Sequence, residues 1–398
     1  MTTAPSAPHP PVRGAAPVTS VASKTSGPSA PSMASVSLPG PRAPLAPGAL
    51  AARTAPAGVT GPAAASALAA RGIPLGRADV EAAAARIAGR VRRTPLLPGL
   101  PAPGLHRTGR RLLLKAEHLQ YSGSFKLRGA ANAVLALGAR RMVTGSSGNH
   151  GIALARLARA LGAEVTVVLA GGAHPAKIAV IKALGGRTVR VPGGVAERDA
   201  RARELAEETG AVLIPSSDHE LVVAGQGTVG LEILAEAPDT ETVYVPTGGG
   251  GLLAGVCLAA YGHPVRVVGV EPAGTPRYAR SLAAGHPVRL APGDSVADGL
   301  RGQQPGAVPY PVIRDRVDDL IAVSDAEILA AAALLRRRGI EAEPSGAVAL
   351  AGAIRAGRGS GAGTGTGTCV AIVSGGNTKA ALMAAAAAAP PSRTHCTT

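Results

Sequence analysis

Between residues 141 and 218 the chain alternates short apolar runs with longer runs whose apolar positions recur at helical spacing. The short runs have the length of a strand, and the segments between them are long enough for helices. Strands alternating with helices predict a parallel sheet with helices on both faces. The predicted elements are strand 142–143 with helix 149–161, strand 165–169 with helix 175–184, strand 188–191 with helix 196–208, and a last strand at 212–214.

The segments on either side continue this pattern. Residues 111–115 predict a strand that leads into a helix from Lys126 to about Leu137, and strands of a second, larger sheet are predicted at 243–245, 265–270 and 370–373. Residues 77–91 predict an amphipathic helix with Asp79 and Glu81 favourably placed in its first turn. Residues 356–368 are rich in Gly, Ser, Thr and Arg and predict a flexible loop before the last strand.

Both ends of the chain have a composition that does not support a folded core. Residues 1–74 are rich in Pro, Ala, Ser, Thr and Gly, with too little bulky apolar surface to offset the entropy of ordering, so we predict disorder there. The segment carries arginine and no acid, as organellar transit peptides do, but it has many prolines and no amphipathic helix. A translation start placed too far upstream explains it equally well. After a polyalanine stretch, we also expect residues 389–398 to be disordered.

Charge, cysteine content and hydrophobicity argue against several classes of protein. The formal charge of +16 comes from arginines spread along the chain, and the basic N-terminal segment has no aromatic residues for stacking bases, so nucleic-acid binding is not expected. The three cysteines, Cys257, Cys369 and Cys396, are too few and too far apart for a disulfide framework or a metal cluster, which fits a reducing cytoplasm. No run of 18 apolar residues occurs, so no membrane span is expected.

Lys126 is the strongest candidate for catalysis. It stands in the stretch 122–130 between small residues, next to Phe125, the only phenylalanine in the chain. Partial burial beside Phe125 and Leu127 would lower its pKa and make it a nucleophile suited to a Schiff base. The alternative is a surface lysine at the start of a helix capped by Ser124.

Three further stretches favour the catalytic interpretation. Residues 144–151 (TGSSGNHG), 246–255 (PTGGGGLLAG) and 374–377 (SGGN) each follow an apolar run and precede a helical one. A strand, a glycine turn and a helix together direct free backbone N–H groups and a helix dipole at an anion. The four consecutive glycines are therefore best interpreted as a phosphate cup.

The set of stretches resembles the pyridoxal-phosphate enzymes of the tryptophan-synthase type (fold type II), and among them the serine/threonine dehydratase and serine racemase family. The resemblance runs from about Ile87 to Met383 and also includes the segments 93–97, 225–228, 297–299 and 343–347. It implies an α/β fold of two parallel-sheet, three-layer domains with the active site between them. The large domain would comprise 75–140 and 219–388, and the small mobile domain 141–218. It also implies pyridoxal 5'-phosphate as cofactor, a small amino-acid substrate, a homodimer or higher homo-oligomer, and a cytoplasmic location.

The resemblance assigns a role to each site residue. Lys126 would bind the cofactor covalently and move the substrate's α-proton, and Asn149 would hydrogen-bond the cofactor's 3'-oxygen. The phosphate cup would be Gly248, Gly249, Gly250 and Gly251, with Leu252 opening the helix behind them. Ser374 would bond the pyridine nitrogen, Phe125 and Gly299 would flank the ring, and Glu343 would lie near its edge, unless Glu343 only caps a helix beside Pro344.

The substrate loop would comprise Ser146, Ser147, Gly148, Asn149 and His150. A general-base role for His150 is the less favoured alternative to support of this loop.

A cation site of the kind found in relatives of serine racemase is not expected. Those relatives bind a divalent cation through the glutamate of a Glu-Pro segment and an acid six residues later. Glu271 and Pro272 are present here, but Arg277 stands at the later position. Glu271 would instead cap a strand end or pair with Arg277.

The resemblance implies an ammonia-lyase that acts on a β-hydroxy amino acid such as L-threonine or L-serine and releases a 2-oxo acid and ammonia. An amino-acid racemase is the main alternative, because Ser147 stands where the resemblance places a second acid/base on the opposite face of the ring. Another fold type II β-eliminase or β-replacement enzyme of specialised metabolism is a further alternative, although cysteine and threonine synthases usually have an aspartate where Leu127 stands. A non-catalytic ligand-binding protein is disfavoured, because Lys126, the glycine cup, Asn149 and Ser374 are all retained.

Overall fold

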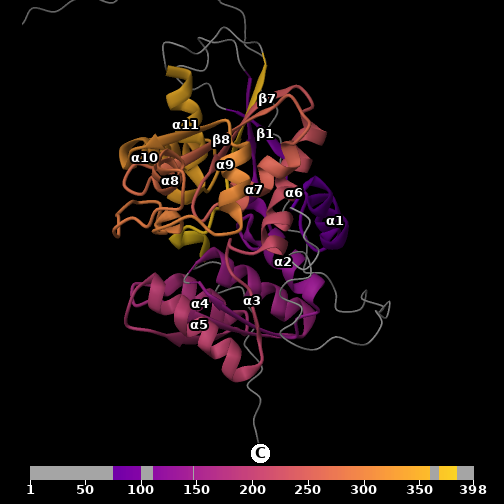
Figure 1. The fold of residues 1–398 in the computed structure, drawn as a ribbon, viewed down its shortest axis with the longest axis vertical. Helices are drawn as coiled ribbons and strands as arrows, with labels where there is room; N and C mark the ends of the chain where they lie inside the picture. Colours follow the sequence, from indigo (N-terminus) through magenta and orange to yellow (C-terminus); the bar gives the residue numbers. More distant parts are fainter. Residues whose placement is uncertain (1–74, 100–110, 147, 359–366, 383–398) are drawn as a thin grey trace, which may run out of the picture. The chain divides into compact units, whose positions relative to one another are not determined.

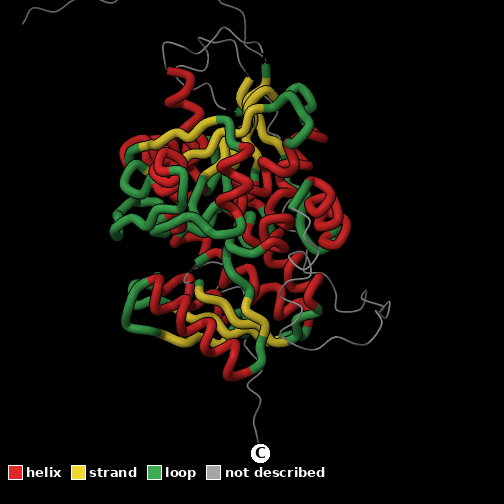
Figure 2. The backbone as a smooth tube through the Cα atoms, viewed as in Figure 1, coloured by secondary structure: helices red, strands yellow, loops and turns green. Residues whose placement is uncertain are grey.

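A computed structural model describes residues 75–99, 111–146, 148–358 and 367–382, all within one compact unit that spans 59–398. The extension before residue 75, Ser147, the segment 359–366 and the tail from residue 383 lie outside the described residues. The predictions of disorder at the two ends, and most of the loop predicted at 356–368, fall in these segments. The described strands form two separate sheets, each accompanied by helices (Figures 1 and 2).

The larger sheet has six strands in the order β1-β2-β10-β7-β8-β9. All neighbours in it are parallel except β1 and β2, which are antiparallel. The strands are β1 (Leu96–Pro98), β2 (Arg111–Lys115), β7 (Thr240–Pro246), β8 (Arg266–Pro272), β9 (Asp319–Val323) and β10 (Thr368–Ile372).

Side chains on alternate strand positions of this sheet pack into different cores. On β7, Val243 and Val245 enter a core shared with helices α6 (Glu220–Glu236) and α7 (Gly251–Ala260). Tyr244 between them packs against residues of α10 (Asp325–Arg337) and α11 (Pro344–Arg358) on the other face. Since successive strand side chains point to opposite faces, an apolar strand requires helices on both sides. This part of the chain is therefore three-layered.

The smaller sheet has four parallel strands in the order β5-β4-β3-β6. It has the same construction, because Val167 of β4 packs into one core and Val168 into another. Helices α3 (Asn149–Leu161), α4 (Pro175–Ala183) and α5 (Val195–Thr209) accompany it (Figure 1). Its strands are β3 (Arg141–Gly145), β4 (Glu164–Leu169), β5 (Arg187–Arg190) and β6 (Val212–Leu213). The predicted alternation at 141–218 is confirmed, whereas the movement of this segment as a separate domain stays a prediction.

Several element boundaries differ from those predicted. The first helix, α1 (Arg77–Ile87), ends before Val91, since Gly89 adopts a positive φ of 73°. Asp79 accepts a hydrogen bond from the Gly76 N–H at 2.8 Å, as expected of an acid in the first turn. Residues 356–358 belong to the last turn of α11 and not to a loop. The remaining helices are η4 (Glu117–Leu119), α2 (Lys126–Leu137), α8 (Arg277–Ala284), η5 (Asp298–Leu300) and α9 (Pro309–Arg316).

Cys257 and Cys369 are buried in the core, and Cys396 lies outside the described residues. Among the described residues there is no group of three His, Cys, Asp or Glu side chains that could hold a metal ion. None of the described helices is both long and apolar enough to cross a membrane.

Candidate active site

Lys126 is the first residue of α2, and its side chain is partly buried. The Nζ atom donates a hydrogen bond to the Ser216 carbonyl at 2.6 Å. Burial and, to a smaller extent, the positive charge of Arg198 lower the pKa of Lys126 to about 8. A lysine with this pKa has a substantial free-amine fraction near neutral pH, as a nucleophile or a proton acceptor requires.

Ser124 does not cap this helix. Phe125 is the N-cap residue and makes no side-chain cap, and the buried Ser124 hydroxyl has no hydrogen-bond partner among the described residues. The interpretation of Lys126 as a capped surface lysine is therefore wrong.

The glycine stretch 248–251 joins β7 to α7 and leaves the start of that helix without a side-chain cap. Gly250 has a φ of 96°, which L-residues other than glycine rarely adopt. A Cβ on Gly249 would collide with the Ser217 hydroxyl, and one on Gly250 would collide with the Tyr278 hydroxyl. Glycine is therefore required at these two positions, because a larger side chain would displace Ser217 or Tyr278.

Two hydrogen bonds fix the orientation of the peptide group between Gly249 and Gly250. The Gly249 carbonyl accepts hydrogen bonds from the Tyr278 hydroxyl at 2.9 Å and from the Gly306 N–H at 3.2 Å. Because the peptide unit is planar and trans, the Gly250 N–H points away from Tyr278 and Gly306. The turn therefore presents a backbone donor beside the N-terminus of α7 on the side away from these two residues, an arrangement that suits a phosphate group.

The loop 144–151 leads from β3 into α3, whose N-cap is Gly148. The Ser146 hydroxyl accepts hydrogen bonds from the Gly148 and Gly151 N–H groups at 3.4 and 3.2 Å, so it supports the loop from within. Asn149 donates through Nδ2 to Oε1 of Glu343 and accepts through Oδ1 from Nδ2 of Asn377 at 2.9 Å. Ser147 lies outside the described residues.

His150 is a buried support of this loop. Its Nε2 lies 3.0 Å from the Ile214 carbonyl, which requires this nitrogen to carry the proton. Burial lowers the pKa of His150 to about 3, and the positive charge of Lys126 acts in the same direction. The ring is therefore neutral near pH 7, and a role as a general base that takes up a proton there is disfavoured.

A chain of polar groups connects Asn149 to the segment around Gly299. Glu343 lies between Asn149 and Lys177, with its Oε2 atom 3.7 Å from the lysine Nζ. Lys177 in turn forms an ion pair with Asp298 at 2.7 Å. Burial alone would lower the pKa of Lys177, but the two carboxylates outweigh it and leave the pKa raised. Glu343 thus does more than cap α11, because its side chain reaches the loop that carries Asn149.

Ser374, Phe125 and Gly299 stand close to this chain of contacts. The buried Ser374 hydroxyl donates to the Ser345 carbonyl at 3.4 Å, and the Ser374 carbonyl accepts from the Phe125 N–H at 3.1 Å. The Gly299 N–H donates to the Ser345 hydroxyl at 3.0 Å. The contacts of Ser345 therefore connect the Ser374 and Gly299 segments.

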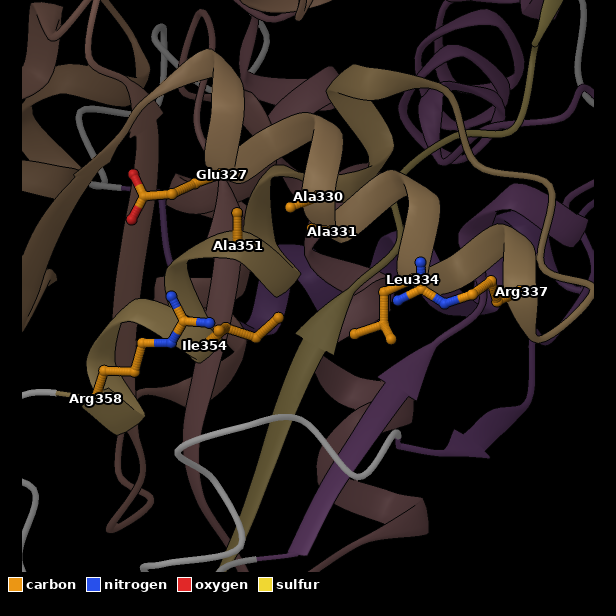
Figure 3. Close-up of a pocket in the computed structure, with 8 residues that line it drawn as sticks. All are labelled: Glu327, Ala330, Ala331, Leu334, Arg337, Ala351, Ile354 and Arg358. Carbon is orange, nitrogen blue, oxygen red and sulfur yellow. The ribbon is translucent and has the colours of Figure 1, made fainter. Parts of the chain in front are cut away.

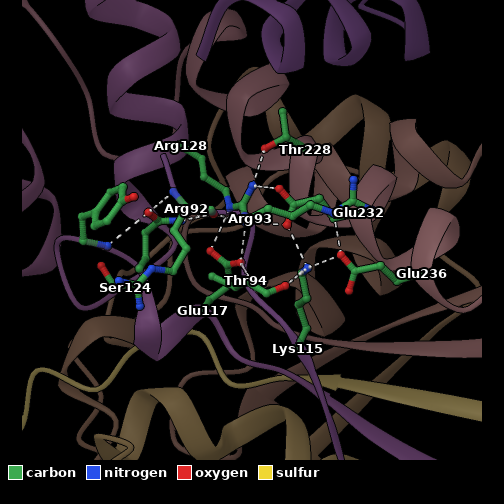
Figure 4. A network of polar contacts seen from close by, with 12 residues as sticks. Arg92, Arg93, Thr94, Lys115, Glu117, Ser124, Arg128, Thr228, Glu232 and Glu236 are labelled. Carbon is green, nitrogen blue, oxygen red and sulfur yellow. Dashed lines mark hydrogen bonds and ion pairs between the residues drawn. The ribbon is translucent and has the colours of Figure 1, made fainter. Parts of the chain in front are cut away.

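A buried network of charges holds the helix that begins at Lys126 (Figure 4). Arg128 forms ion pairs with Glu117 and with Glu232, each at 2.7 Å, and Lys115 forms one with Glu232 at 2.8 Å. The side chains of Arg128, Glu117 and Lys115 are all 0% exposed. Two cations thus balance two carboxylates, and the first turn of α2 is tied to α6, which also provides Thr228 as an acceptor for Arg128 at 3.2 Å.

A separate pocket lies between α10 and α11 (Figure 3). Alanine side chains line it together with Glu327, Leu334, Arg337, Ile354 and Arg358. None of the predicted site residues contributes to it, so it has no part in the arrangement around Lys126.

Comparison with known proteins decides the family. The family model described as "Pyridoxal-phosphate dependent enzyme" matches residues 87–375. The chain belongs to this family. Its cofactor is pyridoxal phosphate, and the fold is that of the fold type II enzymes, as the sequence predicted.

Similar proteins include both racemases and lyases. A serine racemase from Oryza sativa subsp. indica is 38% identical over 282 residues, covering 69% of this chain and 82% of the relative. An L-threonine ammonia-lyase from Geobacter sulfurreducens is 37% identical over 305 residues, covering 75% of this chain and 74% of the relative. The solved structure of maize serine racemase has a TM-score of 0.72 and 36% identity, covering 77% of this chain and 94% of that chain.

The described residues fit pyridoxal phosphate. The turn at 248–251 consists of glycines and has no side-chain cap, so it presents backbone donors at the start of α7, as a phosphate site requires. Lys126 has the lowered pKa that favours addition to an aldehyde, and Ser374 offers a hydroxyl in a buried position. The assignment of individual atoms of the cofactor to these residues stays a prediction.

Sequence reasoning did not single out several polar residues near the site. Lys177 and Asn377 contact Glu343 and Asn149 from parts of the chain far away in sequence, and Tyr278 supports the glycine turn from α8. Of these, only Asn377 belonged to a stretch that the sequence marked. Glu271 caps the start of α8 by accepting hydrogen bonds from the Tyr278 and Ala279 N–H groups, each at 3.0 Å.

Proposed function

We propose that this enzyme is an ammonia-lyase that removes the β-hydroxyl and the α-amino group of an L-threonine- or L-serine-type amino acid. The observation that carries the proposal is the position of the Lys126 amine. It bonds the carbonyl of Ser216, and the next residue, Ser217, lies against Gly249 of the glycine turn. Ser216 and Ser217 thus bring the amine and the glycine turn to the same segment of the chain. This arrangement suits a cofactor that is held covalently at one end and by its phosphate at the other.

Lys126, the start of α3 and Asn149 have different roles in the proposed reaction. The bound cofactor withdraws the electron pair left on the substrate's α-carbon after deprotonation. Lys126 accepts the α-proton at Nζ, for which its pKa of about 8 is suited. Backbone N–H groups at the start of α3 hold the substrate carboxylate, and Asn149 is kept in orientation by Glu343 and Asn377.

Ser374 favours elimination over a long-lived carbanion. Ser374 would hold the pyridine nitrogen through a hydroxyl and would leave that nitrogen largely unprotonated, whereas a carboxylate there would keep the proton and strengthen electron withdrawal. With weaker withdrawal, prompt loss of the β-hydroxyl as water competes better with reprotonation. The resulting enamine then tautomerises and hydrolyses to a 2-oxo acid and ammonia.

A racemase is the second candidate, and the similarity to the Oryza sativa serine racemase supports it. Racemisation requires a proton donor on the face of the substrate opposite Lys126, and Ser147 is the predicted donor. The two activities use the same cofactor and the same lysine, so they differ mainly in what happens after the α-proton has been removed.

Release of 2-oxo acid from a panel of β-hydroxy amino acids tests the proposal. We expect turnover of L-threonine, L-serine or a close analogue, and loss of at least about a hundredfold in Lys126→Ala, because removing a positioned proton-transfer group costs that much. The variant should remain folded and lack the yellow colour that borohydride bleaches. No 2-oxo acid from any member of the panel would contradict the assignment.

A further inference from the structure

Arg277, the first residue of α8, is a buried cation whose hydrogen-bond donors are only partly used. Its side chain is 0% exposed, and its Nη2 atom donates to the Leu300 carbonyl. Within the described part of the chain, its Nε and Nη1 atoms have no hydrogen-bond partner. A buried guanidinium with unused donors is costly, so its retention calls for a compensating negative group.

This side chain lies directly behind the glycine turn. A Cβ placed on Gly248 would stand 3.7 Å from Nη1 of Arg277. The next residue, Tyr278, donates its hydroxyl to the Gly249 carbonyl at 2.9 Å. The first two residues of α8, Arg277 and Tyr278, therefore pack against the glycine turn.

Glu271 binds the start of α8 and forms no ion pair with the Arg277 guanidinium. Both of its carboxylate oxygens accept backbone N–H groups of α8, from Tyr278 and from Ala279. Among the described residues, no hydrogen bond joins the Glu271 carboxylate to Nε or Nη1 of Arg277, and Nη2 is bonded to Leu300. Burial lowers the pKa of Arg277 and the negative charge of Glu271 opposes this effect, but the Glu271 oxygens are bonded to the helix start, so Nε and Nη1 of Arg277 keep unused donors.

We propose that Arg277 supplies the positive charge that stabilises the cofactor's phosphate, acting from behind Gly248. The glycine turn offers only neutral backbone donors, while the phosphate of pyridoxal phosphate carries close to two negative charges near neutral pH. A cation held by α8 at the back of the turn compensates this charge without entering the space that the phosphate occupies. Arg277 is then a positioning residue for the cofactor, whichever of elimination and racemisation the enzyme performs.

Titration of the cofactor-free enzyme with pyridoxal phosphate and with pyridoxal, which lacks the phosphate, tests this role. We expect Arg277→Met to raise the Kd for pyridoxal phosphate at least about tenfold and the Kd for pyridoxal less than about twofold, since only the first ligand carries the charge. Arg280→Met changes an exposed arginine of the same helix and should leave both dissociation constants unchanged. An equal loss of affinity for the two ligands would show a purely structural role and overturn the proposal.

A second variant covers the case in which Arg277→Met does not fold. Arg277→Lys keeps the charge but changes the shape of the group, so it should retain most of the preference for pyridoxal phosphate over pyridoxal. Inorganic phosphate should also raise the Tm of the cofactor-free wild type more than that of Arg277→Met, and by a similar amount in wild type, Arg277→Lys and Arg280→Met. A lysine variant that loses the preference, or a phosphate effect independent of residue 277, would contradict the proposal.

Discussion

At the scale of single residues, the reactivity of the site depends on how far the protein lowers the pKa of Lys126. Burial is the main cause, and the positive charge of Arg198 adds to it. His150 lies in the same environment and is held neutral, so it adds no further charge beside the lysine. Lys126 thus has a pKa close to neutral pH, while His150 stays uncharged there.

The lowered pKa predicts how cofactor uptake depends on pH. With a pKa of about 8 in place of 10.5, the free-amine fraction at pH 7 is larger by a factor on the order of 300. The rate at which the cofactor-free enzyme takes up pyridoxal phosphate should therefore rise with pH through about 8 and then level off. Stopped-flow absorbance measures this rate. A rate that keeps rising to pH 10 would show an unperturbed lysine.

Ser147 separates the two candidate reactions. An eliminase needs a proton acceptor on one face of the substrate, and a racemase also needs a donor on the other. We expect Ser147→Ala to abolish any conversion of L- to D-amino acid while much of the 2-oxo acid release from the L-enantiomer persists. Chiral chromatography and a coupled 2-oxo acid assay measure the two. If both activities fall together, Ser147 serves to hold the carboxylate instead.

At the scale of elements, the first turn of α2 carries Lys126 and is anchored by the buried network around Arg128. Removing the Arg128 charge leaves Glu117, which is fully buried, without its partner. We expect Arg128→Met to reduce the free energy of unfolding by about 3–5 kcal/mol, as loss of one partner in a buried ion pair does. Urea unfolding monitored by circular dichroism measures the change.

Arg93→Met is the matched control for this prediction. Its side chain is 60% exposed and pairs with Glu236 at 2.7 Å, so its loss should cost no more than about 1 kcal/mol. If Arg128→Met is no more destabilising than Arg93→Met, the network does not anchor α2.

The sequence predicted the elements and site segments that are local, and missed those that depend on distant contacts. Lys126, the glycine turn and the loop at 144–151 each lie in a contiguous stretch that follows a strand, so both the chemistry and its place at a strand end are visible in the sequence. Lys177 and Tyr278 look like ordinary helix residues, and their contacts with Glu343 and Gly249 arise only when the chain folds. Strands β1 and β9 were missed because the first is short and both lie at the edges of the sheet.

At the scale of the whole molecule, every described helix and strand lies after the N-terminal extension. The two sheets and their helices are built by residues from Arg77 onward, and the composition of residues 1–74 offers little apolar surface to add. Deleting residues 1–74 should therefore leave kcat and Tm unchanged within error. A marked fall in either value in the truncated enzyme would show that the extension packs on the rest of the protein or at a subunit interface.

The central claim is that the enzyme eliminates a β-hydroxyl faster than it racemises the substrate. The most direct measurement follows both products in one reaction of the purified enzyme with L-serine and with L-threonine, using chiral chromatography for the amino acid and a coupled assay for the 2-oxo acid. The account predicts 2-oxo acid and ammonia in equal amounts, formed faster than any product inverted at the α-carbon. Inversion that outpaces 2-oxo acid formation would contradict it and identify the enzyme as a racemase.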